Sequence, residues 1–246
     1  MVNFNVLDYI FSKVNIPQNA KVLDVGCNNS KTLVYLKNKF CLNGELIGID
    51  KKINQFENDD EQKKFGITLT QMNASEPFKF PDEYFDFIFH KDTLECITNI
   101  DAHIKDLHRV LKKDGTIVCV HRDWESIVVN GSNKQLINKV VYGYANYLQN
   151  SWMDACDGWM GRRIWGYFNK TDLFDGNIDC YNVIETKYIE NTTGYRYINE
   201  MNFFLEPNGF LTESEYNELL DDIQQTYDKK QYIFSMPYYI YVGKKM

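Results

Sequence analysis

The sequence lacks the cysteine patterns that would hold a metal ion or a disulfide framework. Its six cysteines stand singly, without a CxxC pair. Paired cysteines are typical of structural zinc sites, and dense cysteines are typical of small secreted domains. We therefore expect no metal site and a reducing compartment for this chain.

Long apolar runs are also missing. No segment approaches the roughly 20 apolar residues that a membrane-spanning helix needs. The first stretch, MVNFNVLDYIFSKVN, has no basic region followed by a long apolar run, so we expect no signal peptide. These absences favour a cytoplasmic protein without a membrane partner.

Positive charge is scarce as well. Lys and Arg number 27 against 34 Asp and Glu, for a formal net charge of −7, and no stripe of the sequence is rich in Lys and Arg. Nucleic-acid binding depends chiefly on neutralising phosphate charges. We therefore predict that nucleic acid is not a partner.

The chain has enough residues for one large α/β domain. It contains 246 residues, of which 44% are hydrophobic and 25% charged, which is ordinary for a soluble globular protein. It shows no internal repeat, low-complexity segment or interdomain linker. The composition therefore predicts a single domain over residues 1–246.

The clearest local pattern lies near the N-terminus. Residues 22–25 (VLDV) form a short apolar run, which predicts a strand buried on both faces. Gly26 then turns the chain, and Leu33, Leu36 and Phe40 follow at helical spacing. In an open α/β sheet, ligands bind beyond the carboxyl ends of the strands. This turn is therefore a candidate binding site.

A second apolar run, residues 46–50 (LIGID), ends in a carboxylate. Its distance from Gly26 suits one crossover helix and a return strand, and an acid at this position accepts hydrogen bonds from ribose hydroxyls. A pyrophosphate-binding turn needs the three glycines of G-x-G-x-x-G, whereas residues 26–30 contain one. The pattern predicts a nucleoside ligand without phosphates and disfavours an NAD-dependent reductase.

These residues resemble motifs I and II of the class I S-adenosylmethionine-dependent methyltransferases, on the run VLDVGC and the downstream ID. The usual form is D-x-G-x-G-x-G; this chain keeps Asp24 and Gly26 and has Asn28 and Ser30 at the later glycine positions. Asn tolerates a positive φ better than most residues. The resemblance is to the small-molecule, menaquinone/ubiquinone-methyltransferase-like members and covers about half of the chain.

Later passages carry the same resemblance. Residues 81–90 resemble the family's P-F-x-D-x-S-F-D-x-V passage, a turn followed by the fourth strand. Residues 109–120 (RVLKKDGTIVCV) resemble its R-x-L-K-P-G-G passage, in which a helix ends at residues 114–115 and the fifth strand ends at residue 120. Residues 93–96 (TLEC) resemble its L-E-H-I helix, with Cys in place of His.

The resemblance implies S-adenosyl-L-methionine as the cofactor. Asn73 would meet the exocyclic amine of adenine through its amide oxygen, or would serve only as a turn residue. His90 would lie beside the methionine part of the cofactor, in contact through its backbone or with substrate through its side chain. The predicted cofactor-binding residues are Asp24, Gly26, Cys27, Asn28, Ser30, Asp50, Lys51, Asn73, Ala74, His90 and Leu94.

The remaining pattern completes an α/β prediction. The implied fold is a doubly wound, mostly parallel seven-stranded sheet, the Rossmann-like methyltransferase fold, with a helical aromatic lid insertion and a last strand inserted antiparallel. The sequence predicts helices over 3–14, 134–150 and 197–205, a helix from the capping box at 212–215 to about residue 227, and strands over 67–72, 85–89, 180–189 and 232–242.

Polar and aromatic residues follow the fifth strand. A neutral His121 there can take a proton from a hydroxyl or amine acceptor, unless it belongs to an ordinary polar loop. Residues 122–175 correspond to the family's substrate lid and are rich in aromatic side chains, which would exclude water or form a small accessory core. The predicted substrate-binding residues are Trp124, Trp159 and Arg162, with a surface salt bridge as the alternative for Arg162.

The sequence thus predicts an enzyme that transfers a methyl group from S-adenosylmethionine to an O or N atom of a small organic acceptor. Two alternatives stay open at this point. One is methylation of a protein side chain, which needs an open acidic groove. The other is a catalytically inactive scaffold subunit, which the absent later glycines favour. An exposed aromatic lid would also allow a homodimer.

Overall fold

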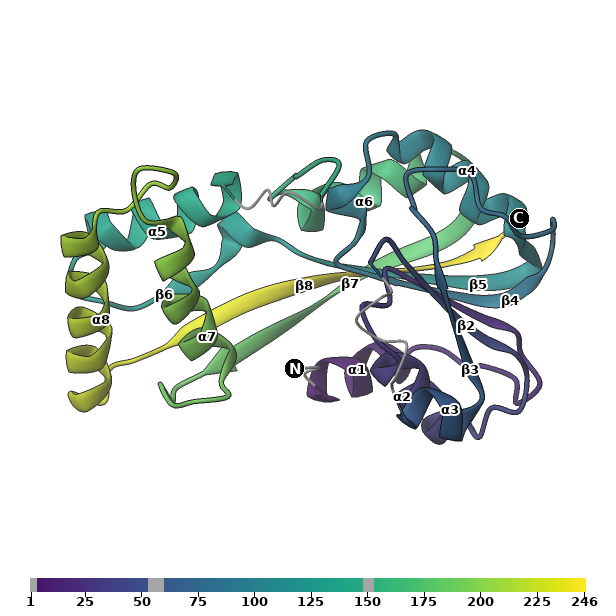
Figure 1. The fold of residues 1–246 in the computed structure, drawn as a ribbon, viewed down its shortest axis with the longest axis horizontal. Coiled ribbons are helices and arrows are strands. Elements are labelled where there is room, and N and C mark those ends of the chain that lie inside the picture. Colours follow the sequence, from purple (N-terminus) through teal and green to yellow (C-terminus); the bar gives the residue numbers. More distant parts are fainter. Residues whose placement is uncertain (1–3, 53–59, 148–152) are drawn as a thin grey trace. The chain divides into compact units, whose positions relative to one another are not determined.

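A computed structural model describes residues 4–52, 60–147 and 153–246 (Figure 1). Parts of three predictions lie outside these ranges: residue 3 of the first predicted helix, residues 148–150 of the helix predicted over 134–150, and Trp152 of the predicted lid. The helices are α1 (Phe4–Phe11), α2 (Lys31–Phe40), α3 (Asp60–Phe65), α4 (Ile100–Val110), α5 (Lys134–Tyr147), α6 (Met160–Asn169), α7 (Thr193–Asn199) and α8 (Glu213–Asp228), with short 3₁₀ helices η1 (Leu94–Cys96), η2 (Trp124–Ser126) and η3 (Glu200–Phe204). The strands are β1 (Val22–Val25), β2 (Leu46–Asp50), β3 (Ile67–Gln71), β4 (Phe85–Lys91), β5 (Leu111–Arg122), β6 (Val128–Val129), β7 (Phe174–Glu185) and β8 (Phe234–Lys245).

The strands form one mostly parallel sheet in the order β3-β2-β1-β4-β5-β8-β6, with β7 also paired to β8. The pairs β1–β2, β1–β4, β2–β3 and β4–β5 are parallel. The predicted doubly wound α/β fold is therefore confirmed. Over the described residues the sheet has eight strands rather than seven, because the two-residue β6 pairs antiparallel with β8 and is too short to show a period.

Helices cover both faces of the parallel strands. Helices α1, α2 and α3 lie on one face and α4 lies on the other (Figure 1). All four residues of β1 are buried, as expected for a central strand covered on both sides. On the first face, Phe11 of α1 packs against Phe89 of β4 with ring centroids 5.0 Å apart. This packing holds the central strands and therefore the loops at their carboxyl ends.

The strand order reverses beside β1. The chain runs outward from β1 through β2 to β3 and then returns to place β4 on the other side of β1. At such a switch point the loops that leave the two neighbouring strands diverge and open a crevice for ligands. The loops after β1 and β4 therefore form a candidate binding site.

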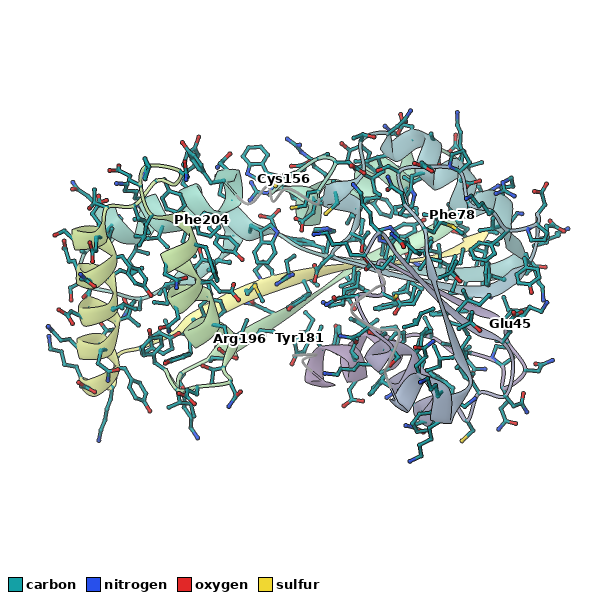
Figure 2. All side chains as sticks on the ribbon, viewed as in Figure 1. Glu45, Phe78, Cys156, Tyr181, Arg196 and Phe204 are labelled. Carbon is teal, nitrogen blue, oxygen red and sulfur yellow. The ribbon has the colours of Figure 1, made fainter. Side chains whose placement is uncertain are left out.

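The chain divides into two compact units. Unit 1 comprises residues 1–121, 163–179 and 239–246, and unit 2 comprises 122–162 and 180–238. Within unit 2, Tyr144 of α5 packs its ring against Tyr197 and Phe204, with centroids 4.8 and 5.4 Å away; Phe204 is labelled in Figure 2. Unit 2 therefore has an aromatic core of its own. The single-domain description and the lid over 122–175 stay predictions.

The boundary between α4 and β5 differs from the prediction. Helix α4 ends at Val110, four residues before the predicted turn, and β5 begins at Leu111 and continues to Arg122. The register with β4 jumps from Leu111 to Thr116, so the intervening residues bulge, and Asp114 has a φ of 62°. The Asp-Gly pair at residues 114–115, which predicted the end of the helix, lies in this bulge instead.

Candidate functional site

The turn after β1 admits no side chain at Gly26. Its φ of 70° lies in the left-handed region, and an added Cβ would come within 2.0 Å of Thr93 Oγ1. Thr93 follows β4 and donates a hydrogen bond from its hydroxyl to Lys91 O at 3.0 Å. The loops after β1 and β4 therefore close on each other at the switch point, and Gly26 is the residue that permits it.

The same turn is tied to the end of β2. Asn28 has a φ of 54°, in the region that its amide side chain tolerates. Its backbone N–H donates to Asp50 Oδ2 at 2.9 Å, and the backbone N–H of Lys52 donates to Asp50 Oδ1 at 3.0 Å. The structure thus brings together the predicted residues Asn28 and Asp50. The Asp50 carboxylate keeps acceptor capacity, because each oxygen can accept a second hydrogen bond.

Asp24 of β1 is a buried carboxyl group. Its side chain is 2% exposed, and within the described parts of the chain its Oδ2 has no hydrogen-bond partner. Burial raises the pKa of Asp24 to about 8, with Lys91 opposing the rise and Asp50 adding to it. Burial likewise raises the pKa of the Cys27 thiol, which is therefore neutral. A cation brought to Asp24 would favour its ionised form.

Three further predicted cofactor residues lie beside these turns. Ser30 is buried at the N-cap of α2 and makes no side-chain cap hydrogen bond there. Lys51 is exposed, and its carbonyl accepts a hydrogen bond from Gln71 Nε2 at 3.1 Å. Leu94 in η1 is completely buried. Any contact of Leu94 with a ligand therefore requires a neighbouring group to move aside.

The loop after β3 contains Asn73 and Ala74. Asn73 Oδ1 accepts the backbone N–H of Ser75 at 3.0 Å, which makes a local turn. The carbonyl of Ala74 accepts a hydrogen bond from His103 Nδ1 of α4 at 2.9 Å. Sequence reasoning missed His103, whose ring is 4% exposed. The three-residue spacing of His103, Asp106 and Arg109 shows that the three share one face of α4, but does not show what that face contacts.

His90 lies near the end of β4, in the interior of the protein. Its side chain is fully buried, and its Nε2 lies 3.0 Å from Nε2 of His103. None of the residues that the structure describes forms a hydrogen bond with His90 Nδ1. Burial lowers the pKa of His90 well below its ordinary value, and His103 and His121 lower it further. His90 is therefore a neutral imidazole in unit 1.

His121 lies within β5, not in a loop after it. Strand β5 continues to Arg122, and the His121 side chain is fully buried. Its Nε2 accepts the backbone N–H of Glu95 at 3.4 Å. This long hydrogen bond uses the lone pair that a proton acceptor needs, so His121 can act as a base only if Glu95 shifts.

In unit 2, Trp124 is a packed side chain. It is 3% exposed, with its ring 5.1 Å from that of Tyr144. The guanidinium carbon of Arg122 lies 3.9 Å from the centroid of the Trp124 ring, within cation–π range. Trp159 is 39% exposed and donates its indole N–H to Glu125. Of the two indoles, Trp159 is the one that presents a surface to an acceptor.

Arg162 is paired with a buried carboxylate. Its Nε donates to Asp123 Oδ2 at 2.7 Å, and its backbone N–H donates to the same oxygen at 3.0 Å. Gly161 makes this approach possible, because a Cβ there would lie 2.8 Å from the Asp123 nitrogen. Burial raises the pKa of Asp123, but hydrogen bonds from Arg162 and Ser126 outweigh it and the pKa lies below its usual value. Arg162 thus forms an ion pair, but with a fully buried carboxylate and not at the surface as the alternative prediction had it.

The described residues contain neither a membrane-spanning helix nor a metal-binding cluster. Among the described helices, none is both long enough and apolar enough to cross a membrane. In the same parts of the chain, no group of three or more His, Cys, Asp or Glu side chains is arranged to hold a metal ion.

Sequence comparison finds a family match within the first half of the chain. Residues 23–119 match the protein family described as "Methyltransferase domain". A demethylmenaquinone methyltransferase of Staphylococcus carnosus is 28% identical over 134 residues, which are 54% of this chain and 55% of that protein. The chain thus spans about half the length of the curated relatives that it matches.

Solved structures extend the likeness to the fold of nearly the whole chain. A putative methyltransferase of Bacillus halodurans has a TM-score of 0.64 at 16% identity and covers 98% of this chain and 99% of that chain. Phosphoethanolamine N-methyltransferase 2 of Haemonchus contortus, in complex with S-adenosyl-L-methionine, has a TM-score of 0.58 at 17% identity and covers 98% of this chain and 52% of that chain. The chain therefore has the Rossmann-like methyltransferase fold, and its residues 23–119 are similar to the methyltransferase domain family.

Proposed function

We propose that this protein transfers a methyl group from S-adenosyl-L-methionine to a small organic acceptor. The observation that carries the proposal is Asp50, whose carboxylate lies at the end of β2 and is fixed by the backbone N–H groups of Asn28 and Lys52. A carboxylate held in this way is preorganised to accept hydrogen bonds from the two hydroxyls of a ribose.

Other groups at this edge fit the same cofactor. The turn after β1 has one glycine and lacks the glycines that a pyrophosphate needs. The unpartnered Oδ2 of Asp24 suits a cation, since an ammonium or sulfonium nearby would stabilise the ionised carboxylate. The amide oxygen of Asn73 is the kind of acceptor that an exocyclic amine needs. The residues present therefore favour a cationic adenosine derivative over a dinucleotide.

The protein's part in the reaction is to bind and orient. When bound, the cofactor supplies a methyl group on a positively charged sulfur, from which an acceptor lone pair can displace a neutral thioether. Holding two reactants in line can lower a barrier by about 7–11 kcal/mol. We assign Asp50 and Asn73 to the adenosine part of the ligand, with Gly26 permitting the turn that shapes the site.

His121 is our candidate base for an acceptor that arrives protonated at O or N. Its Nε2 accepts the Glu95 N–H at 3.4 Å, so this role requires Glu95 to shift and release the Nε2 lone pair. We expect His121→Asn to lower kcat for methyl transfer to an O–H or N–H acceptor at least tenfold, while cofactor affinity measured by calorimetry stays unchanged. An unaltered kcat would remove His121 from the mechanism.

The acceptor is proposed to be enclosed by the aromatic residues of unit 2, with Trp159 and Arg162 as candidate contacts. Residues 122–238 lie beyond the family match, so acceptor specificity does not transfer from the relatives. A quinone-type acceptor is the second candidate, favoured by the sequence match to demethylmenaquinone methyltransferases. We further propose that the protein works in the cytoplasm without a nucleic-acid partner, and that its aromatic surface allows a homodimer.

Calorimetric titration tests the proposal directly. We expect micromolar binding of S-adenosylmethionine and S-adenosylhomocysteine and no binding of NADH. Asp50→Ala should weaken cofactor binding about 100-fold, because it removes two charge-assisted hydrogen bonds of about 1.5 kcal/mol each. The exposed Asp221→Ala is the matched control and should leave affinity unchanged.

The negative outcomes separate the alternatives. Unchanged affinity in Asp50→Ala would remove the ribose assignment. No binding of either cofactor form by the wild-type protein would favour a scaffold subunit. Binding of the cofactor together with methylation of proteins and not of small molecules would favour a protein methyltransferase.

A further inference from the structure

One face of helix α4 holds the loop that follows β3. His103 donates to Ala74 O at 2.9 Å, the Asp106 carboxylate accepts the backbone N–H of Phe78 at 2.5 Å, and Arg109 Nη2 donates to Phe78 O at 2.9 Å. The three side chains lie three residues apart, at the spacing that places them near one another on a helix. The path of the loop is therefore set by α4.

The proton positions along the His103 end of this face can be deduced. A carbonyl oxygen only accepts, so His103 Nδ1 carries the proton that reaches Ala74 O. Burial lowers the pKa of His103 to about 4, so the ring is neutral at pH 7 and its Nε2 has a lone pair. His90 Nε2, at 3.0 Å, must then carry a proton and donate it. The chain of donors runs from His90 through His103 to Ala74.

This chain ends in an unpaired acceptor. With its proton on Nε2, His90 has a lone pair on Nδ1, which has no partner among the described residues although the side chain is fully buried. A buried polar atom without a partner costs about 1–3 kcal/mol. The Oγ of Ser75, next to Ala74, is also buried without a partner. Two buried imidazoles with an unpaired nitrogen stabilise the core less than apolar side chains would, so stability alone does not account for them.

The bond to Ala74 places the histidine pair at the adenine end of the proposed cofactor site. Asn73, whose amide oxygen faces the exocyclic amine in our proposal, directly precedes Ala74 in the loop. The turn between Asn73 Oδ1 and the Ser75 N–H spans Ala74, so the position of the Ala74 carbonyl fixes the direction of the Asn73 side chain. Movement of His103 would therefore change the direction of the Asn73 amide, which in our proposal contacts the adenine.

We propose that His103, held in place by His90, is a positioning residue that fixes the loop at residues 73–75 and thereby sets the preference of the site for adenine over hypoxanthine. This inference rests on the proposed function. It assigns to the buried pair a role in selecting the nucleobase, whereas the reacting methyl group is not involved.

Two substitutions at His103 separate its two contacts. The side-chain nitrogen of Asn can take the place of Nδ1, so His103→Asn keeps the donor to Ala74 and loses the contact with His90. The end of a Gln side chain takes the place of Nε2, so His103→Gln keeps the contact with His90 and loses the donor to Ala74. His108→Gln is the matched control, because His108 lies on the same helix and packs against Phe174 instead.

The readout is the ratio of affinities for S-adenosylhomocysteine and S-inosylhomocysteine, measured by calorimetry on each full-length protein. We expect the wild-type protein to prefer adenine at least tenfold. His108→Gln should keep that ratio, His103→Asn should reduce it about threefold because it loses the contact with His90, and His103→Gln should reduce it about tenfold. Should His103→Gln fail to fold, His90→Leu loosens His103 from its other side and should reduce the ratio about threefold.

The outcomes that overturn the inference are distinct from those that overturn the proposed function. A wild-type protein that binds neither ligand contradicts the proposed function. A wild-type protein that binds both ligands equally, or a His103→Gln protein that keeps the wild-type ratio, contradicts the inference alone. Equal loss of affinity for both ligands in His103→Gln would make His103 a structural residue only, and would also overturn it.

Discussion

At the scale of single residues, Gly26 combines two constraints that an alanine would violate. Its φ of 70° strains any side chain, and an added Cβ would lie 2.0 Å from Thr93 Oγ1. We therefore expect Gly26→Ala to lower the free energy of unfolding by about 3 kcal/mol, combining backbone strain with overpacking. Urea denaturation of the purified proteins measures this loss.

Gly66 supplies the matched control. It has a φ of 63° but nothing lies within 4 Å of the position of its Cβ. Gly66→Ala should therefore show the backbone cost alone, about 1 kcal/mol. Thr93→Ala should recover part of the loss in the Gly26→Ala background, because it removes the nearest atoms. Equal losses at both glycines would show that the Thr93 contact is unimportant.

The second residue-scale prediction concerns Asp24 and pH. Its folded-state pKa of about 8 exceeds the ordinary value of 3.8, so the folded protein binds more protons than the unfolded chain between these values. The stabilisation is fully present below pH 3.8 and is lost as the pH rises through 8. Between pH 6.5 and 8 the wild-type protein should lose about 2 kcal/mol relative to Asp24→Asn, which has no carboxyl to ionise.

Thermal unfolding at a series of pH values checks this sign. The Tm of the wild-type protein should fall by several degrees more than that of Asp24→Asn over this interval. Asp221→Asn, at an exposed position, should follow the wild-type protein. Parallel curves for wild type and Asp24→Asn would mean that Asp24 is ionised in the folded protein.

At the scale of elements, helix α8 shows a local signal that needs no tertiary information. The sequence predicts its capping box, and the structure confirms it: the Glu215 N–H donates to Thr212 Oγ1 at 3.2 Å, and the Thr212 N–H donates to Glu215 Oε2 at 2.9 Å. Thr212→Ala should cost about 1 kcal/mol of stability, measured by urea denaturation. Ser214→Ala, exposed in the same turn, should cost much less, and equal costs would argue against the cap.

Other elements were predictable to the extent that their signals are local. The buried runs predicted β1 and β2 with their observed bounds, because both faces are covered and the runs are continuous. Strand β7 begins at Phe174, earlier than the predicted residue 180, because its first half alternates polar and half-buried side chains. Its extent is set by pairing with β8, which depends on residues far away in the sequence.

The residues of the candidate site also differ in whether their signals in the sequence are local. The cofactor residues at the ends of β1 and β2 were predictable because each follows an apolar run and a family motif. His103 was not, because its hydrogen-bond partners Ala74 and His90 are 29 and 13 residues away in the sequence. A histidine on an amphipathic helix gives no sign of which buried atoms it will meet until the helix is placed against the sheet.

At the scale of the whole molecule, the division into two compact units places every predicted cofactor residue in unit 1. The family match, residues 23–119, lies entirely within the same unit. Ligand binding stabilises the part of a protein that unfolds together with the site. We therefore expect S-adenosylhomocysteine to slow amide hydrogen exchange in α2 and at residues 73–75, and to leave α5 and α8 of unit 2 unchanged.

Hydrogen exchange followed by mass spectrometry measures both units in one experiment. Asp50→Ala with the same ligand is the control and should show little protection in either unit, because it binds weakly. Equal slowing in α2, α5 and α8 would contradict the prediction and would mean that the two units unfold as one. Protection confined to unit 1 would support a cofactor site built by the residues of that unit.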